Sequence, residues 1–416
     1  MKQFIRNEFT RRLIALRIFV STELPTLNER IMRKEYCTMR FASQCGSHVE
    51  EVLNTKGSLI YTGNFAWNTM QPISYIVSSI ERHFQTFHIP QKAFDVLPAG
   101  TEDLMIECGR ILSIPPRDNI YTTWLKNRRF KFDNNKGWST FKSGVLIFER
   151  CCREANKRLR LILDGTVQLS HVGAIQLLNE VYMFIEEIFQ NWKTFMQKDQ
   201  NGEYANISPT YFMYVFRTFF LEYQVGGENW SGTNAANIAS GMSFDYLLGC
   251  IDDFYDDVVI ERLRYVSPED RKSLLKDMNS SSLVSLFTEE LEITNELLKT
   301  ASTYQLLQTV HATTVDSLRP AFNAFQRVVK KWSSLSLLHK GMISTFLEKP
   351  AHHLKDQGCP LGFDVPVVSP EAGTGGMRHN DTHAIMEMRT KNKCIESLNY
   401  IFNHAPEIVE NNLILK

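Results

Sequence analysis

His339 is the residue whose type and surroundings most directly suggest chemistry. It lies in the middle of an apolar helical stripe whose other members are Trp332, Leu335, Met342, Ile343 and Phe346. A buried imidazole needs a partner for at least one ring nitrogen, and a metal, a carboxylate or a backbone carbonyl could each provide it. No histidine follows at the i+4 position, which excludes a two-histidine metal site on this helix. Because a haem iron needs only one imidazole from the protein, His339 is either an axial ligand or a core histidine.

Arg217 is a single cation within the aromatic stretch 211–220, which reads YFMYVFRTFF. A helix start precedes this stretch, with Ser208 as the N-cap and Pro209 at the first helical position. If the guanidinium is buried, a substrate carboxylate, a haem propionate or an internal acid could neutralise it. The alternative is that the long side chain reaches solvent.

Two glycine-containing segments could contact a ligand. Residues 225–237 concentrate small residues, amides and hydroxyls, as expected where backbone lies against a flat ligand, although a plain long loop has the same composition. Residues 373–376 read GTGG and could offer free backbone amides to an anion. They lack the Lys-Ser/Thr ending of a phosphate-binding loop and the third glycine of a dinucleotide-binding loop, so a flexible turn is the alternative.

His379 and His383 have i, i+4 spacing, with Asp381 between them in the sequence. On one helix face the two imidazoles could form a small metal site or contact propionates and substrate. A polar, solvent-facing helix start is the alternative interpretation.

The composition is that of an ordinary soluble protein. Of the 416 residues, 43% are hydrophobic and 22% are charged, and the 46 basic side chains balance the 46 acidic ones. This balance gives no electrostatic sign of nucleic-acid binding. Eight cysteines without a CxxC pair favour reduced thiols in the cytoplasm over a disulfide scaffold or a structural zinc site.

The N-terminal residues are basic and apolar. The apolar stretch 13–20 is interrupted by Arg17 and is too short to cross a membrane, so we expect no membrane association. A basic amphipathic start also occurs in transit peptides, but Glu8 and Glu23 favour an ordinary first helix.

Helical periodicity dominates wherever a long pattern can be read, as in residues 141–161, 169–195 and 318–347. No strong run of alternating strand residues and no repeat occurs. We therefore expect a mainly α fold, with a large helical bundle over residues 96–416. Residues 1–95 should form a smaller, less regular subdomain, interrupted by Gly57, Gly63, Pro72 and Pro90.

The order of these features resembles the haem-dependent indoleamine and tryptophan dioxygenase superfamily over roughly residues 95–390. The features that carry the resemblance are Pro115-Pro116 with Tyr121 and Trp124, Ser208 through Arg217, Gly232-Thr233-Asn234-Ala235-Ala236-Asn237, Phe244 through Gly249, His339, and Gly373-Thr374-Gly375-Gly376. Residues 207–209 and 225–227 are closer to the pyrrolnitrin-pathway branch, whose known member oxidatively rearranges a chlorinated tryptophan. The GTGG sequence and residues 247–249 are closer to indoleamine dioxygenase.

Two departures from these patterns affect the substrate assignment. Asn234 stands where indoleamine dioxygenases usually place serine, and residues 377–383 fit neither branch.

The resemblance implies a helical bundle that encloses haem b, with His339 as the iron ligand. It implies that dioxygen at the ferrous iron attacks the C2–C3 bond of tryptophan or a related indole. Monooxygenation or ring rearrangement in natural-product biosynthesis, or haem binding without turnover, are the alternatives. The protein is expected to be a monomer or a small homo-oligomer.

The resemblance also implies roles for individual residues. Arg217 would hold the substrate carboxylate, while Phe212 and Met213 would form the pocket wall. The remaining substrate contacts would come from Asn234, Gly373, Thr374 and Gly375, with distal candidates Trp138, Ser139, Phe141 and Ser143. The further haem contacts would be Gly232, Thr233 and Trp332.

Overall fold

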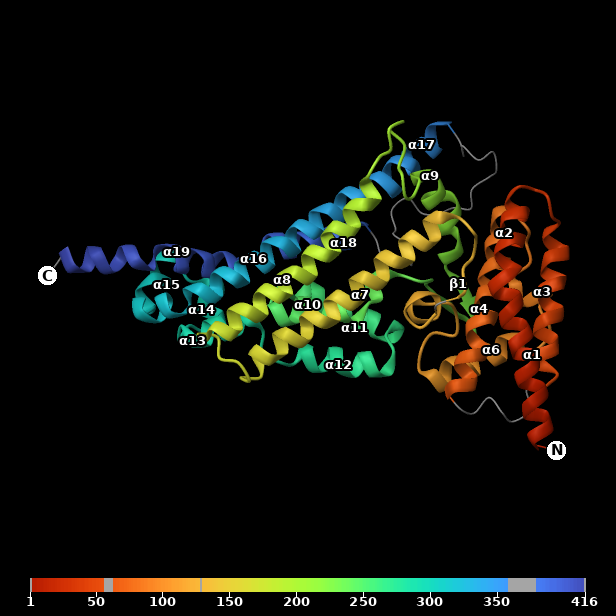
Figure 1. The fold of residues 1–416 in the computed structure, drawn as a ribbon, viewed down its shortest axis with the longest axis horizontal. Helices are drawn as coiled ribbons and strands as arrows, with labels where there is room; N and C mark the ends of the chain where they lie inside the picture. Colours follow the sequence, from red (N-terminus) through yellow and green to blue (C-terminus); the bar gives the residue numbers. More distant parts are fainter. Residues whose placement is uncertain (1, 56–62, 128, 358–378, 415–416) are drawn as a thin grey trace.

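The computed structural model describes residues 2–55, 63–127, 129–357 and 379–414 and consists almost entirely of helices (Figure 1). The prediction of a mainly α fold is confirmed. One antiparallel hairpin interrupts the helices, formed by β1 (Tyr223–Val225) and β2 (Glu228–Trp230) with Tyr223 opposite Trp230. No helix in these described ranges is both long enough and apolar enough to cross a membrane.

The N-terminal helices form one end of the molecule (Figure 1). They are α1 (Lys2–Thr22), α2 (Leu24–Met32), α3 (Thr38–Leu53), α4 (Gly63–Thr86), α5 (Ala93–Val96) and α6 (Thr101–Leu112). This region is more regular than the sequence suggested. Pro72 lies inside α4, where a proline usually costs about 3 kcal/mol, but burial on nearly every side of this helix outweighs that cost.

The first 95 residues share a hydrophobic core with later segments. Phe9 of α1 and Ile80 of α4 belong to the same buried cluster as Phe212 and Phe346. The boundary near residue 95 stays a prediction.

Three long helices run side by side along the molecule: α7 (Lys136–Leu163), α8 (Val172–Lys193) and α16 (Ala312–Ile343) (Figure 1). The helical patterns expected at 141–161, 169–195 and 318–347 are thus present. Asn135 caps α7 by accepting a hydrogen bond from the Gly137 amide. Along α8 the buried residues recur at helical spacing and face the two partner helices: Leu178, Val181, Ile185 and Ile188.

Shorter helices cover the bundle. They are α10 (Ala239–Leu248), α11 (Asp253–Arg262), α12 (Pro268–Met278), α13 (Leu283–Glu290), α14 (Asn295–Thr300) and α15 (Thr303–Thr309). The last elements are α17 (Lys349–Gln357), α18 (His379–Thr390) and α19 (Lys393–Ile414), and α18 packs against α16. The C-terminus of α19 lies at the end of the molecule opposite the N-terminal helices (Figure 1).

Several single turns depart from α-helical geometry. Three are π-helical: η2 (Tyr121–Leu125), η4 (Phe212–Phe216), which follows the short helix α9 (Pro209–Tyr211), and η8 (Ser344–Glu348), which continues α16. The 3₁₀ turns are η3 (Thr194–Met196), η5 (Arg217–Phe220), η6 (Ala235–Asn237) and η7 (Leu263–Tyr265). Single π turns often occur at functional sites because they redirect side chains locally.

Candidate functional site

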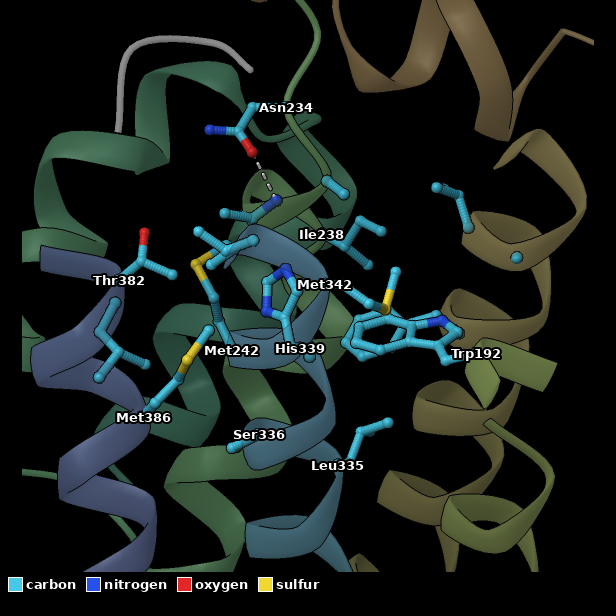
Figure 2. Close-up of a pocket in the computed structure, with 18 of the residues that line it drawn as sticks. Trp192, Asn234, Ile238, Met242, Leu335, Ser336, His339, Met342, Thr382 and Met386 are labelled. Atoms are coloured by element: carbon cyan, nitrogen blue, oxygen red, sulfur yellow. Dashed lines mark hydrogen bonds between the residues drawn. The ribbon is translucent and has the colours of Figure 1, made fainter. Parts of the chain in front are cut away.

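His339 lies beside a cavity of about 220 Å³ between the long helices and α18 (Figure 2). We call it the His339 cavity. Its lining is mainly apolar and comes from segments far apart in the sequence. It includes Phe141, Phe148, Trp192, Phe212, Asn234, Met242, Tyr255, Arg262, Trp332, Leu335, Ser336, His339, Met342, Phe346, Thr382, Ile385, Met386 and Arg389.

The imidazole of His339 points into the cavity from α16 (Figure 2). Its ring centroid lies 5.3 Å from that of Trp192. Burial, reinforced by the positive charge of Arg389, lowers the pKa of His339 to about 4. The ring is therefore neutral at physiological pH, and no described residue donates to or accepts from its nitrogens. A neutral imidazole with an available lone pair is the form that ligates a metal.

An aromatic wall closes one end of the cavity, and two of the π turns supply it. Phe212 comes from η4 and Phe346 from η8, and their rings meet edge to face at 5.8 Å. Phe141 of α7 lies 5.5 Å from the Phe212 ring. The expected role of Phe212 as a wall residue is consistent with this placement.

Arg217 and Met213 are buried but do not line the His339 cavity. Arg217 is only 3% exposed, and its Nη1 lies 3.3 Å from the Met213 sulfur. Burial lowers the pKa of Arg217 to about 10, so the side chain remains a cation at neutral pH. Its assignment as a carboxylate clamp stays a prediction.

The loop that follows β2 divides its residues between two roles. Asn234 lines the cavity, and its side chain accepts a hydrogen bond from the Ala236 amide (Figure 2). Thr233 lies outside the lining, with its hydroxyl 2.6 Å from the hydroxyl of Thr123. A Cβ at Gly232 would lie 2.3 Å from the Phe220 carbonyl oxygen, so this glycine permits a close backbone contact. The geometry gives Gly232 and Thr233 a role in holding the loop.

The candidates on α7 face in different directions. Phe141 reaches the cavity, whereas Ser139 and Ser143 are exposed and do not line it. Trp138 is buried, and its ring lies 6.3 Å from that of Trp124.

The C-terminal candidates are only partly described. Gly373, Thr374 and Gly375 lie outside the described residues. His379 begins α18, and its side chain is likewise outside the described set. His383 lies on the same helix, and its Nε2 is buried without a hydrogen-bond partner among the described residues. The paired role of the two histidines stays a prediction.

Trp332 lines the cavity, and its indole nitrogen donates to Asp245 at 2.7 Å. Its role as a haem contact stays a prediction. Sequence reasoning missed Asp245, Arg262 and Arg389. One signal for Asp245 was available: it is the one charged residue of the mainly apolar segment 242–248. Arg262 and Arg389 bring two cations to an otherwise apolar lining, from helices that no sequence pattern connects.

No cluster of three or more histidine, cysteine, aspartate or glutamate side chains suited to a metal ion occurs among the residues that the structure describes. The protein is thus a helical bundle that holds the neutral imidazole of His339 in a mainly apolar, aromatic cavity. A site of this class is suited to a flat, hydrophobic ligand.

The family model of monodechloroaminopyrrolnitrin synthase PrnB matches residues 40–340, which is most of the chain and includes His339. The chain therefore belongs to the monodechloroaminopyrrolnitrin synthase PrnB family, an enzyme family. This match confirms the resemblance to the pyrrolnitrin-pathway branch. No curated protein matches the chain.

Proposed function

We propose that this chain is a haem-dependent oxygenase that acts on tryptophan or a tryptophan-derived indole, with His339 as the residue that would hold the haem iron. The observation that carries the proposal is the neutral imidazole without a described partner, which faces an apolar cavity in a member of this family. A core histidine would be expected to bond to a neighbouring side chain or carbonyl.

The residues present fit a haem. The cavity offers one nitrogen ligand, flat aromatic surfaces such as Trp192, and one arginine, Arg262, whose charge suits a carboxylate group on a macrocycle or substrate. When bound, the haem iron would supply the activation of dioxygen, which amino-acid side chains cannot provide.

The chain's own contribution is ligation, orientation and exclusion of water. His339 would fix the iron through one ring nitrogen. Phe141, Phe212 and Phe346 would stack against the indole and keep solvent away from it. Arg217 would orient the substrate carboxylate, which requires access that the present cavity lining does not include.

Within the same class, oxidative rearrangement of the indole ring is the second candidate, and the family match favours it over simple dioxygenation. Product mass separates the outcomes. Conversion of tryptophan to N-formylkynurenine adds two oxygen atoms to the substrate, and hydroxylation adds one. A rearranged product is identified by its new ring system, which NMR detects.

The ligand assignment is tested by titrating purified protein with haemin and recording the Soret band. We expect His339→Ala to lose the band or to bind haemin at least about tenfold more weakly, while the exposed His353→Ala serves as the matched control. Haemin binding that is equal in both variants contradicts the assignment.

The carboxylate clamp is tested separately. Arg217→Ala should raise KM for a carboxylate-bearing indole while leaving KM for an indole without the carboxylate unchanged. An unchanged KM for both substrates removes this role from Arg217.

A further inference from the structure

Asp245 of α10 is a fully buried carboxylate that accepts four hydrogen bonds. Oδ1 accepts from Trp332 Nε1 at 2.7 Å and from Arg389 Nε at 2.8 Å. Oδ2 accepts from the Tyr255 hydroxyl at 2.6 Å and from Arg389 Nη2 at 2.5 Å. A carboxylate held by this many donors is fixed in position.

The three donor residues share a property that Asp245 lacks. Tyr255, Trp332 and Arg389 all line the His339 cavity, whereas Asp245 lies behind them and does not. They come from α11, α16 and α18 respectively. One carboxylate therefore connects three walls of the cavity to α10.

The contact between Asp245 and Arg389 of α18 joins residues far apart in the sequence. Asp245 and Arg389 are 144 positions apart, and the guanidinium binds the carboxylate through two nitrogens. The same guanidinium lies 4.8 Å from the centroid of the Trp332 ring. The backbone carbonyl of Arg389 accepts a hydrogen bond from the Ser333 hydroxyl of α16 at 2.8 Å.

Helix α18 forms one side of the cavity. Thr382 and Met386 of α18 lie on one side of His339 and Trp192 of α8 lies on the other (Figure 2). The position of α18 against α16 therefore sets the width of the space beside the imidazole.

Charge balance gives the carboxylate a second role. Arg389 lines an apolar cavity, where an unpaired guanidinium would be costly. Its bidentate pairing with Asp245 neutralises that charge and fixes its direction.

We propose that Asp245 is a positioning residue: through Arg389 it holds α18 in place as a wall of the His339 cavity. The residue touches no ligand itself, and the proposal does not depend on which ligand the cavity takes.

The proposal is tested by amide hydrogen exchange on the full chain without added ligand, comparing residues 382–390 with α8. Asp245→Asn and Arg389→Gln should each speed exchange in residues 382–390 by about tenfold, with a much smaller change in α8. The double variant Asp245→Asn/Arg389→Gln leaves a neutral pair that can still hydrogen-bond, and it should restore much of the protection.

Asp118→Asn is the matched control because Asp118 is equally buried and also paired to an arginine, but it does not line the His339 cavity and is bonded to Ser78, Tyr223 and Thr233 rather than to α18. Its effect should not concentrate in residues 382–390. If Asp245→Asn fails to fold, Arg389→Gln decides the question alone, since Trp332 and Tyr255 still satisfy Asp245 in that variant.

Haemin dissociation from the same variants gives a second readout. We expect dissociation to be about tenfold faster in either single variant and slower again in the double variant. The proposal is overturned if exchange in residues 382–390 rises no more than in α8, or if the double variant is no better protected than the singles. Failure of the unmodified chain to bind haemin would overturn the proposed function and leave the exchange result to decide on Asp245.

Discussion

Two buried aspartate–arginine pairs in this molecule use the same chemistry for different tasks. Arg117 and Asp118 are neighbours in the sequence, both fully buried and 2.8 Å apart. Arg117 also donates to the backbone carbonyls of Leu221 and Trp230 at 3.0 and 2.6 Å. Its pair thus fixes the hairpin that leads into the loop around Gly232, whereas the Asp245–Arg389 pair joins α10 to α18 behind the wall of the cavity.

The difference lies in what each pair brings together. Arg117 and Asp118 remain close even in the unfolded chain because they are adjacent in the sequence. What their pair fixes in the fold is therefore the position of the carbonyls to which Arg117 donates. The Asp245–Arg389 pair can form only when α10 and α18 are packed together, so this pair itself fixes how the two helices are placed. A buried ion pair between sequence neighbours can therefore anchor a loop, whereas a pair between distant residues can fix the distance between helices.

The largest expected effect comes from breaking the first pair. Arg117→Met leaves the Asp118 carboxylate buried without its cation and removes both bonds to the hairpin carbonyls. We expect a loss of about 3–5 kcal/mol in the free energy of unfolding, measured by urea denaturation. A loss below about 1 kcal/mol would show that Asp118 is satisfied without Arg117, by Ser78 and Tyr223.

The loop that the first pair supports is tested by Gly232→Ala. The added Cβ would approach the Phe220 backbone, so the loop must shift, at a cost of about 1–3 kcal/mol in unfolding free energy. Gly341 of α16 is the matched control, because nothing lies within 4 Å of a Cβ there. Gly341→Ala should stabilise the helix by about 0.5–1 kcal/mol. Equal effects at both positions would contradict the close-contact role of Gly232.

A third buried carboxylate, Asp133, has no arginine bound to it directly, and its pKa shows the effect of burial without such a partner. Burial raises the pKa of Asp133 to about 6, against the lowering effect of a hydrogen bond from the Tyr211 hydroxyl. Because the folded-state pKa exceeds the unfolded value of 3.8, its contribution to stability is greatest below about pH 4 and is lost as pH rises through about 6.

This loss should amount to something on the order of 2 kcal/mol between pH 4 and 7, and Asp133→Asn should abolish it. Urea denaturation at a series of pH values measures the difference between the two proteins. A parallel pH dependence in both would assign it to other groups.

The smallest effect is expected at Arg82, a buried arginine without a carboxylate partner. Its Nε donates to the Thr218 hydroxyl at 2.7 Å and its plane lies 4.1 Å from the Phe219 ring, but neither terminal nitrogen has a partner in the described part of the chain. Burial lowers the pKa of Arg82 to about 9. Arg82→Met removes this desolvated charge. The free energy of unfolding, measured by thermal denaturation, should therefore change by less than about 1 kcal/mol in either direction. A loss as large as that of Arg117→Met would place Arg82 with the paired arginines.

Local sequence signals predicted the parts of the fold that local physics determines. The 3.6-residue pattern located the long helices, and Ser208 with Pro209 marked a helix start that the structure contains. The apolar stripe around His339 was readable for the same reason, because its members line the cavity from one side of α16 and, for Phe346, from η8 that continues it.

Features that depend on distant contacts could not be read in this way. The regularity of the N-terminal region comes from tertiary burial of α4, which outweighs the local effect of Pro72. The Asp245–Arg389 pair joins helices whose approach no spacing encodes. The close approach of Gly232 to the Phe220 backbone is likewise visible only in the folded chain, and the predicted ligand contact of this loop stays a prediction.

The π turn η8 at the aromatic wall has a consequence for how the cavity can be reshaped. It lies between α16 and α17 and is wound more widely than the α-helices on either side, so it holds about one extra residue. Deleting one residue from η8 would rotate the segment after it by about 100°, which would turn the Phe346 and Leu347 positions while leaving the bundle helices in place. A single-residue deletion in η8 should therefore change the shape of the cavity in this chain more than a substitution that keeps the turn.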